Sequence, residues 1–361
     1  MRRKTREVKV GNVIIGGNAP IVVQSMCKNN IKNFDKLTEE LYELENAGCE
    51  LIRVAITDNE DIRYIRKIKK VTSIPLVADI HFDYHLALGA INEGIDKIRI
   101  DPGNINDRKK LRYIIQEAKR RNVAIRIGIN SGSMEKDILR KYNGKVTPEG
   151  MIESAIRHIR FCEDNDFYDI VISLKASDVS KTIDAYTLLS DKCDYPFHIG
   201  ITHAGDIESA KIKSAVGLGV LLYEGIGDTI RISLPTSSKD EVYVAYEILK
   251  SLGIRNYGRS LIVCPSCGRC KINLFDLAEK IKKETEHIRE PIKIAVMGCV
   301  VNGPGESKEA DIAVYSTNTR NNRYVIYRKG IPVKTVAEER EVLPALLREI
   351  NIYRKEFLST P

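Results

Sequence analysis

Four cysteines in the C-terminal third of the chain have the type and spacing of metal ligands. Cys264, Cys267 and Cys270 follow one another at intervals of three around Pro265, and Cys299 stands in a later glycine-rich segment. Thiols with this spacing can point at one centre, and a thiol from a distant loop can complete the set. The C-x2-C-x2-C spacing favours an iron–sulfur cluster held by four thiolates. Zinc is the main alternative, but a zinc ribbon usually provides two cysteines on each of two knuckles, and the second segment here provides one.

The other four cysteines form no such pattern. They are isolated in the sequence, and we interpret them as small buried side chains: Cys27, Cys49, Cys162 and Cys193. The first residues are polar and charged, with no apolar run of the signal-peptide type, and the chain has no run of roughly 18 or more apolar residues. These features predict a cytoplasmic protein without a membrane span, in which thiols stay reduced and can bind metal.

Length and charge narrow the class of protein further. The chain has 361 residues, more than one core usually supports, so we expect a large domain and a smaller one. Lysine and arginine outnumber aspartate and glutamate by 57 to 49, a net charge of +8, and aromatic residues make up only 6% of the chain. A small excess of scattered cations with few aromatics does not indicate nucleic-acid binding, but it suits an anionic ligand.

Eight short apolar runs alternate with amphipathic segments in the first 250 or so residues, a length typical of one barrel domain. The runs are residues 21–26, 51–56, 74–82, 97–103, 124–130, 169–177, 197–205 and 229–235. The segments between them, such as residues 35–44 and 109–118, carry apolar residues at helical spacing. This alternation predicts an α/β fold with a (β/α)8 TIM barrel, and a doubly wound open sheet is the alternative.

A smaller domain is predicted after the barrel. We assign residues 1–252 to a substrate-binding barrel and the polar, glycine-containing segment 253–259 to a linker. Residues 260–361 predict a small α+β domain, with strands at 260–263, 291–296, 311–315 and 324–327 and a helix at 274–286. The metal-type cysteines lie in the segments that follow the first two of these strands.

The predicted barrel strands carry an unusual number of charged residues. Residues two apart on a strand face the same side, so that Arg99 groups with Asp101, and Arg126 with Asn130. If these faces point inward, the barrel is lined by cations, four of which are Arg53, Arg99, Arg126 and Lys175. Burying several cations together is unfavourable unless an anion compensates them, so the lining predicts a phosphorylated or diphosphorylated substrate. The alternative is that each cation pairs with a barrel carboxylate, such as Asp79 or Asp101.

Further polar residues lie where loops should leave the strands. Asp79 and His81 end the third predicted strand, Asn104 follows the fourth, and His203 lies near the end of the seventh. Asp79 and His81 could act as acid and base or hold a hydroxyl group, although a single histidine at a strand end is often structural. Glu224 stands beside Gly225 at the entry to the last strand and is a weak candidate by itself.

Taken together, these motifs resemble the 4-hydroxy-3-methylbut-2-enyl diphosphate synthase family, in its compact two-domain bacterial form. The resemblance runs from about residue 10 to residue 306, in the order expected of that family. The segments that carry it are VADIHFDY at 77–84, RIDPGN at 99–104, SLKASD at 173–178, EGIGDT at 224–229 and GCVVNGPGE at 298–306.

The resemblance implies a [4Fe-4S] cluster held by Cys264, Cys267 and Cys299, with Glu306 as the fourth ligand. This differs from the four-thiolate set suggested by spacing, because family members generally lack a cysteine at the position of Cys270. We follow the family, since a carboxylate is a harder and more exchangeable ligand of iron than a thiolate and could free one iron for a substrate oxygen.

The resemblance also implies an enzyme of the methylerythritol phosphate route to isoprenoids. Such an enzyme opens the ring of 2-C-methyl-D-erythritol 2,4-cyclodiphosphate and removes a hydroxyl as water, giving 4-hydroxy-3-methylbut-2-enyl diphosphate. Two electrons pass singly through the cluster from flavodoxin or ferredoxin, and we expect Glu224 to donate the proton. The residues expected to bind the substrate are Arg53, Asp79, His81, Arg99, Asn104, Arg126, Asn130, Lys175, Ser177, His203 and Arg231.

A homodimer follows from the same resemblance, with the cluster domain of one subunit over the barrel of the other, and with neither nucleic acid nor membrane as a partner. Two other classes of function compete with this interpretation. One is a cluster-bearing electron carrier or radical enzyme with an unrelated phosphorylated substrate. The predicted barrel of eight strand–helix units is too large for a protein that only carries electrons, and the C-x3-C-x2-C spacing of radical enzymes is missing. The other is a zinc-stapled binding module, against which the predicted inward-facing cations argue.

Overall fold

The structure is a computed structural model that describes residues 2–105, 107–270, 272–317 and 323–359. Compactness divides the chain into two units, Met1–Arg255 and Asn256–Pro361. This division lies inside the segment 253–259 that the sequence suggests as a linker. The two units are described separately below.

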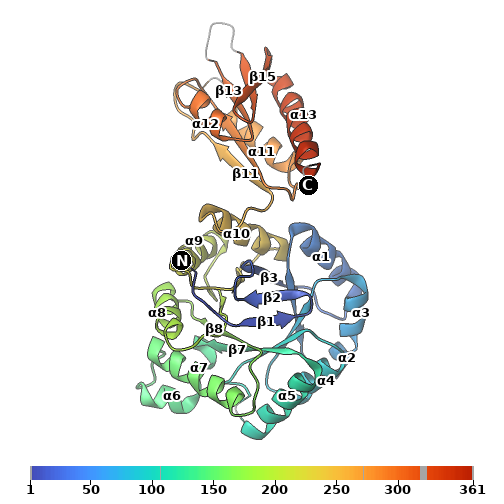
Figure 1. Cartoon of the computed structure of the whole chain (residues 1–361), viewed down its shortest axis with the longest axis vertical. Helices are drawn as coiled ribbons and strands as arrows, with labels where there is room; N and C mark the ends of the chain where they lie inside the picture. The colour runs from blue at the N-terminus through green and yellow to red at the C-terminus, as the bar shows by residue number, and fades with distance from the viewer. Residues whose placement is uncertain (1, 106, 271, 318–322, 360–361) are drawn as a thin grey trace. The chain divides into compact units, whose positions relative to one another are not determined.

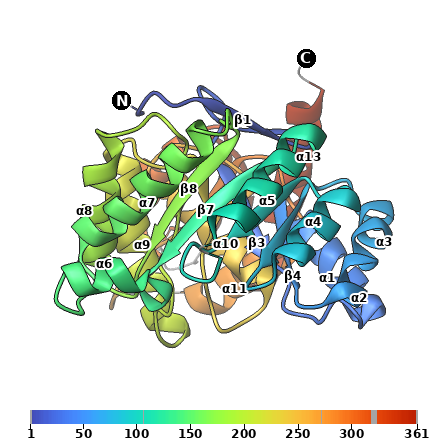
Figure 2. The same cartoon turned by 90° about the horizontal axis from the view of Figure 1, so that it is seen from below.

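The first unit is a barrel of eight parallel strands surrounded by helices (Figures 1 and 2). The strands pair in the order β8-β7-β6-β5-β4-β3-β10-β9, and a parallel bridge between Ile172 and Phe197 joins β8 to β9. Their bounds are β3 (Val22–Met26), β4 (Leu51–Ile56), β5 (Leu76–Ile80), β6 (Lys97–Ile100), β7 (Ala124–Asn130), β8 (Ile170–Lys175), β9 (His198–Ile199) and β10 (Thr229–Ile230). The predicted (β/α)8 barrel is therefore confirmed, and the open doubly wound sheet is excluded.

Helices connect the strands and cover the outside of the barrel. Many of them begin at a polar N-cap, such as Asp178 or Asp206, whose side chain accepts a hydrogen bond from the first turn. Their inner faces are apolar; α1, for example, buries Leu37, Leu41 and Leu44. The bounds are α1 (Phe34–Ala47), α2 (Asn59–Ile62), α3 (Tyr64–Val71), α4 (Tyr84–Asn92), α5 (Arg108–Arg121), α6 (Lys136–Lys141), α7 (Pro148–Glu163), α8 (Val179–Ser190), α9 (Ile207–Tyr223) and α10 (Ser238–Ser251), with a 3-10 turn at Ser131–Ser133.

The last two barrel strands are much shorter than the apolar runs 197–205 and 229–235 that predict them. Beyond Ile199 and Ile230 the backbone leaves the regular ladder, although the Arg231 N–H still donates to the Ile199 carbonyl. Gly200 permits a close approach here, because a Cβ at that position would lie 2.5 Å from the Arg231 carbonyl oxygen and 2.8 Å from Lys175 Nζ. The Lys175 side chain and the Arg231 backbone therefore pack tightly against Gly200.

An antiparallel hairpin that the sequence analysis did not predict covers one end of the barrel (Figure 1). It consists of β1 (Glu7–Val10) and β2 (Val13–Gly16). The two residues between the strands, Gly11 and Asn12, are typical hairpin residues and could have indicated it. Its apolar residues pack against the first inward residues of the strands: Val22, Leu51, Val77, Ala124 and Val171. The amino end of the barrel is therefore a mainly hydrophobic floor. Lys97, which is paired with Val77 and Ala124, lies at the level of this floor, and the other charged residues of the strands lie toward the carboxyl end.

The second unit contains a five-stranded mixed sheet, as predicted for a small α+β domain. Strands β11 (Arg259–Val263), β12 (Ile292–Met297) and β13 (Ile312–Ser316) are parallel, and β14 (Tyr324–Arg328) and β15 (Ile331–Val336) continue antiparallel. The helices are α11 (Leu274–Glu284), α12 (Gly303–Glu309) and α13 (Glu339–Leu358). Strand β15 and helices α12 and α13 were not predicted. Parallel pairing of β11 with β12 puts the segments after both strands at the same edge of the sheet.

Candidate functional site

Inward-facing residues of the barrel strands form a cluster of buried charges, which we call the lumen cluster. Its carboxylates are Asp79 and Asp101, and its basic residues are Arg53, Lys97, Arg99, Arg126 and Lys175. They alternate with apolar residues along each strand, because successive residues of a strand face opposite sides. Their register confirms the grouping: Asp79 is paired with Arg99, and Arg99 with Arg126, on adjacent strands.

Ion pairs satisfy part of the lumen cluster. Arg99 Nη1 lies 3.2 Å from Asp79 Oδ1, and Arg99 Nη2 lies 2.9 Å from Asp101 Oδ2. Burial by itself would raise the pKa of Asp79, but the charge of Arg53, a hydrogen bond with His81 and the charge of Arg99 lower it well below its ordinary value. Asp79 is therefore ionised, and it holds two of the cations in place.

The deeper cations lack such partners. Among the described residues, the Nε and Nη1 of Arg126 and the Nζ of Lys97 have no hydrogen-bond partner, although Arg126 is 2% exposed and Lys97 is fully buried. Burial lowers the pKa of both side chains, and neighbouring cations lower it further. A buried donor without an acceptor is costly, so this part of the lumen is suited to an anion. The expectation that each cation has its own carboxylate does not hold here.

Lys175 contacts a histidine that the sequence analysis did not single out. Lys175 Nζ lies 3.1 Å from His198 Nε2, and His198 Nδ1 lies 2.8 Å from Thr229 Oγ1. Burial and the adjacent Lys175 lower the pKa of His198 well below its ordinary value, so the imidazole is neutral. With Nε2 accepting from the lysine, Nδ1–H donates to the threonine hydroxyl. Both His198 and Lys97 lie on predicted strands, and the two-residue period would have placed them inward.

Several predicted residues gather at the carboxyl end of the barrel around the Arg99 ion pairs. His81 Nε2 lies 2.9 Å from Arg99 Nη1, and His81 Nδ1 lies 2.8 Å from Asn104 Nδ2. Asn130 Nδ2 donates to Asp101 at 3.2 Å. Phe82, the residue after His81, has a left-handed backbone with φ of 64°, a strained conformation for a side chain of this size. Strain of this kind is common at binding sites and marks this end of the barrel as the functional end.

Three other predicted residues are near this end without joining the cluster. Arg231 is held by Glu241 of α10, with Nη2 3.1 Å from Oε1, and its Nη1 donates to Ser233 at 3.1 Å. Ser177 is exposed directly after β8. His203 is also exposed, with φ of 51°, in the loop that precedes α9.

Glu224 lies at the opposite end of the barrel. It is the exposed residue that caps the C-terminus of α9, and the next residue, Gly225, accepts a backbone hydrogen bond from Arg3 in the segment before the floor hairpin. A barrel helix returns the chain to the amino end before the next strand begins, so a residue in this loop cannot reach the carboxyl end of its own barrel. That Glu224 donates the proton with which the hydroxyl leaves as water stays a prediction, and within its own barrel this side chain lies at the amino end.

The cysteines of the second unit lie at the carboxyl edge of β11 and β12. Val263 pairs with Val296, and the Cys264 N–H donates to the Val296 carbonyl at 3.0 Å. Cys299 follows β12 on the neighbouring strand. A Cβ at Gly298 would lie 2.6 Å from Cys270 Sγ, so this glycine allows the first cysteine segment to pack beside the second. Cys267 is exposed at the same edge, and Glu306 is exposed in α12, which follows Cys299.

The chemistry of these donors fits an iron–sulfur cluster. Backbone N–H groups of Val301 and Asn302, together with the Arg269 side chain, lower the pKa of Cys299 despite an opposing effect of burial. The first of these, at Val301, has the largest effect. A thiolate is the form of cysteine that binds metal, so the segment favours the ligand state. Within the described residues, no three such side chains already converge on one point.

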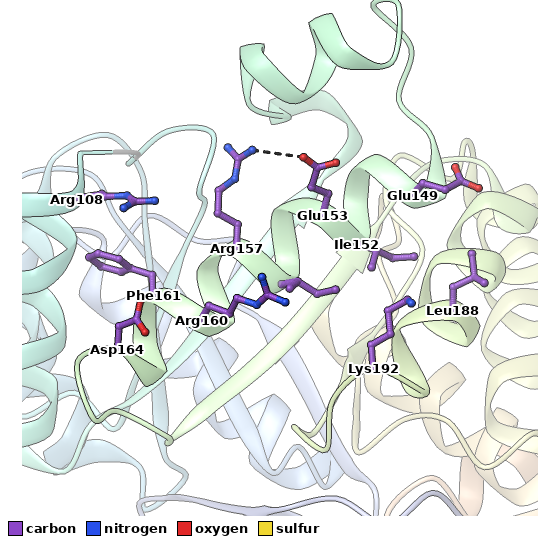
Figure 3. Close-up of a pocket in the computed structure, with 11 residues that line it drawn as sticks. Arg108, Glu149, Ile152, Glu153, Arg157, Arg160, Phe161, Asp164, Leu188 and Lys192 are labelled. Carbon is purple, nitrogen blue, oxygen red and sulfur yellow. Dashed lines mark ion pairs between the residues drawn. The ribbon is translucent and has the colours of Figure 1, made fainter.

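A surface groove outside the barrel offers a contrast with the lumen cluster (Figure 3). It has a volume of about 780 Å³ and lies over α7 and its neighbours. One of its cations is paired, since Arg157 lies 3.7 Å from Glu153 Oε1 and 2.7 Å from Asp137 Oδ2. The charges of the groove are of both signs and are exposed or half-buried, whereas those of the lumen are buried and predominantly positive.

Comparison with known proteins reveals close relatives. The "GcpE TIM-barrel domain" family model matches residues 5–246, and the "GcpE protein C-terminal domain" model matches residues 260–352. A protein of Caldanaerobacter subterraneus subsp. tengcongensis, named 4-hydroxy-3-methylbut-2-en-1-yl diphosphate synthase (flavodoxin), is 52% identical over 99% of each chain. A protein of the same name from Nitratidesulfovibrio vulgaris is 49% identical over 98% of this chain and 90% of its own.

Two further observations are independent of these relatives. The solved dihydropteroate synthase of Yersinia pestis is similar over 68% of this chain and 98% of its own, but at 11% identity and a TM-score of 0.49 it does not bear on the site. In the described part of the chain, no helix is both long and apolar enough to cross a membrane.

Proposed function

This chain belongs to the GcpE family, and from that membership we propose that it is a 4-hydroxy-3-methylbut-2-enyl diphosphate synthase. The enzyme acts on 2-C-methyl-D-erythritol 2,4-cyclodiphosphate in the methylerythritol phosphate route. Two electrons and the accompanying protons enter, the ring opens at a carbon–oxygen bond to the diphosphate, and one hydroxyl leaves as water. The observation that carries this proposal is the set of buried lumen cations with donors that have no hydrogen-bond partner in the described part of the chain, Lys97 and Arg126 foremost.

The lumen cations bind the diphosphate. Arg126 and Lys175 have no carboxylate partner among the described residues and donate to phosphate oxygens, while Asp79 and Asp101 keep Arg99 oriented. Ring opening leaves a new negative charge on the diphosphate. Preorganised cations stabilise such a charge without reorganising, and a low-dielectric site strengthens the effect. Arg53, Arg231, Asn104, Asn130 and Ser177 complete the lining around the substrate.

Acid–base groups are assigned to the carboxyl end of the barrel. Glu224 lies at the other end, so we assign the acid–base role to His81, an imidazole at the carboxyl end of the lumen beside Arg99 and Asn104. It remains 39% exposed, so it can exchange protons with solvent. His203 lies in a neighbouring loop of the same end and is available to a substrate hydroxyl.

The cysteine edge is assigned to a [4Fe-4S] cluster held by Cys264, Cys267, Cys299 and Glu306. When bound, such a cluster passes electrons one at a time, which matches a donor such as flavodoxin or ferredoxin. The Glu306 carboxylate is the most exchangeable of the four ligands. Cys270 lies against Gly298 and donates to the Ile272 carbonyl at 3.3 Å, so its thiol has a structural partner without iron.

The functional protein is a homodimer in which the cluster domain of one subunit serves the barrel of the other. The barrel binds the anionic substrate, and the second unit supplies electrons, so neither unit is sufficient alone. Closure of such an arrangement would exclude water from the reacting groups.

Spectroscopy of anaerobically purified protein tests this function directly. Iron and sulfide are counted, and visible and EPR spectra are recorded before and after addition of the cyclodiphosphate under reducing conditions. We expect about four irons per chain, as the cluster type requires, a signal that changes with substrate, and no change when Arg126→Met protein is used at the same substrate concentration. A colourless protein with stoichiometric zinc that cannot be reconstituted with iron and sulfide would overturn the proposal.

A further inference from the structure

Cys270 is the cysteine of the segment 264–270 that the assigned cluster does not use. It is half-buried and packs at the edge of the core of the second unit. Its Sγ donates to the Ile272 carbonyl at 3.3 Å and lies against Gly298. Cys267, three residues earlier, is exposed. The two thiols are thus neighbours in the chain but differ in their access to solvent.

A tight turn joins Cys267 to Cys270. The Cys270 N–H donates to the Cys267 carbonyl at 2.9 Å, and Gly268 and Arg269 form the bend between them. A four-residue turn of this kind brings its first and last Cα atoms within about 7 Å of each other. A disulfide spans roughly 4.4 to 6.8 Å between Cα atoms, so the turn brings these two cysteines into the range that a disulfide requires.

The other cysteines of this edge are less suited to pair with Cys267. Cys264 has the same spacing from it on the other side, but Ser266 between them has a left-handed backbone with φ of 69°. No backbone hydrogen bond joins the Cys267 N–H to the Cys264 carbonyl, both of which the structure describes. Cys299 follows a different strand and is only 7% exposed. Cys270 is therefore the cysteine best placed to bond with Cys267.

Cys267 is also the most accessible of the three cysteines assigned to the cluster. Cys264 is half-buried and Cys299 is buried. A Cβ at Gly268 would meet no described atom within 4 Å, so the turn is open on its outer side. An accessible thiol is oxidised first, to a sulfenic acid. Without a second thiol nearby, further oxidation gives sulfinic and sulfonic acids, which thiol reductants do not restore.

We propose that Cys270 is a resolving cysteine, which captures oxidised Cys267 as a disulfide when the cluster has been lost. The inference rests on the proposed function in that Cys267 is taken as a cluster ligand. Hydrogen peroxide oxidises the Cys267 thiol to a sulfenic acid, and one water is released. The Cys270 sulfur then attacks the Cys267 sulfur, the sulfur–oxygen bond breaks, and a second water leaves. Two thiols and one peroxide thus give one disulfide and two waters.

The disulfide and the cluster exclude each other. The Cys267 sulfur cannot bind iron as a thiolate while it is bonded to Cys270. A dithiol reductant reverses the bond by thiol–disulfide exchange and returns both thiols. The pair therefore keeps an exposed cluster ligand recoverable after contact with an oxidant, because the chain stops at a reversible stage of oxidation.

Peptide mass spectrometry of the full-length protein tests the pairing. Cluster-loaded protein is treated with hydrogen peroxide, free thiols are alkylated, and the chain is digested with trypsin, which cuts after Arg269. A bond between Cys267 and Cys270 then appears as two linked peptides, lighter by two hydrogens than the two reduced peptides together. We expect this product after peroxide, and alkylation of both thiols in untreated protein. Absence of a disulfide, or one that joins Cys264 to Cys267 within a single peptide, would overturn the proposal.

Cys270→Ser separates protection of Cys267 from iron binding. Before peroxide, the variant is expected to take up as much iron and sulfide as the wild type, because Cys270 is not a cluster ligand. After peroxide and then dithiothreitol, the wild type is expected to recover its iron on reconstitution. The variant is expected to recover several-fold less, with two or three added oxygens on Cys267.

Cys193→Ser, at a solitary half-buried cysteine of the barrel, is the matched control and should behave like the wild type throughout. Equal recovery by Cys270→Ser and wild-type protein would contradict the resolving role, and so would failure of Cys270→Ser to load iron before peroxide. Protein that forms the disulfide but never binds iron would remove the proposed function and leave the pairing standing. Loaded protein in which Cys267 gains oxygens without forming the disulfide would remove the pairing alone.

Discussion

The barrel lumen and the cysteine edge represent two ways of preparing a site. Lumen side chains project from strands, are buried, and are partly held by ion pairs such as Arg99 with Asp79. The cysteines lie on segments after strands, Cys267 is exposed, and the described side chains do not yet converge. The first site is complete before its ligand arrives, whereas the second is of the kind that its cofactor completes.

This difference has an energetic cause. Cations on strands cannot move apart, so their repulsion is stored in the folded protein until an anion binds. Thiols on loops can rotate toward solvent, so little repulsion is stored at the cysteine edge. Changes in the lumen should therefore alter both stability and binding, but changes at the cysteine edge should alter cofactor retention alone.

The largest effect is expected from removal of a cysteine ligand. Cys299→Ala should abolish cluster incorporation, because the thiolate that backbone N–H groups favour is lost. The measurement is iron and sulfide content after anaerobic reconstitution, together with the unfolding curve. Cys193→Ala, at a solitary cysteine of the barrel, is the control and should retain full content. Equal iron content in Cys299→Ala and wild-type protein would sink the ligand assignment.

The second-largest effect is expected from the loss of a lumen cation. Arg126→Met keeps the length of the side chain but removes the unpartnered donors, and it should weaken binding of the cyclodiphosphate about a hundredfold, as for a buried charge-assisted contact. Isothermal titration calorimetry measures the affinity. Arg160→Met in the outer groove is the matched control and should bind like the wild type. If both variants bind equally well, the lumen is not the anion site.

The two ends of the barrel can be compared through their candidate proton donors. His81→Gln removes the titratable group next to Arg99 and should lower turnover about a hundredfold, a typical contribution of general acid catalysis. Glu224→Gln, at the floor end, should retain turnover when assayed at concentrations where the dimer is intact. Steady-state rates of cluster-loaded protein provide the measurement. The opposite ranking of the two variants would restore Glu224 as the donor.

A smaller effect is expected from the deepest lysine. Lys97→Met replaces a buried ammonium without a hydrogen-bond partner, among the described residues, with an apolar side chain of similar length. It should raise the free energy of unfolding of the substrate-free protein by about 1 to 2 kcal/mol, while weakening anion binding. Urea unfolding at pH 7 measures the first effect. A destabilised variant would show that Lys97 has a favourable role in the free protein.

The same lysine predicts a pH dependence. Its pKa in the folded protein is well below the ordinary 10.5, chiefly through burial, so between these two values the unfolded chain binds more protons than the folded one. Wild-type stability should therefore rise with pH in this window, and the advantage of Lys97→Met should shrink as the pH approaches 10.5. A stability difference between the two proteins that is constant from pH 7 to about 10 would contradict a depressed pKa for Lys97.

Much of this protein was accessible from local sequence patterns. The eight strand–helix units, the inward-facing Arg99 and Arg126, and the position of the cysteines after two strands all follow from the two-residue period of strands and the helical period between them. Such periods are properties of short segments, so they can be recognised in the sequence without knowledge of the fold. The same period would also have placed Lys97 and His198 in the lumen.

Other features were decided by the tertiary structure alone. The family resemblance suggested Glu224 as the proton donor, but only the direction of α9 shows that it lies at the floor end of its own barrel. Whether Arg126 has a partner depends on side chains from several strands. The sequence by itself determined which residues face the lumen, because that is set within each strand. Which end of the barrel a loop occupies, and which charges and faces remain unpaired, arise between elements distant in the chain, so only the folded arrangement decided them.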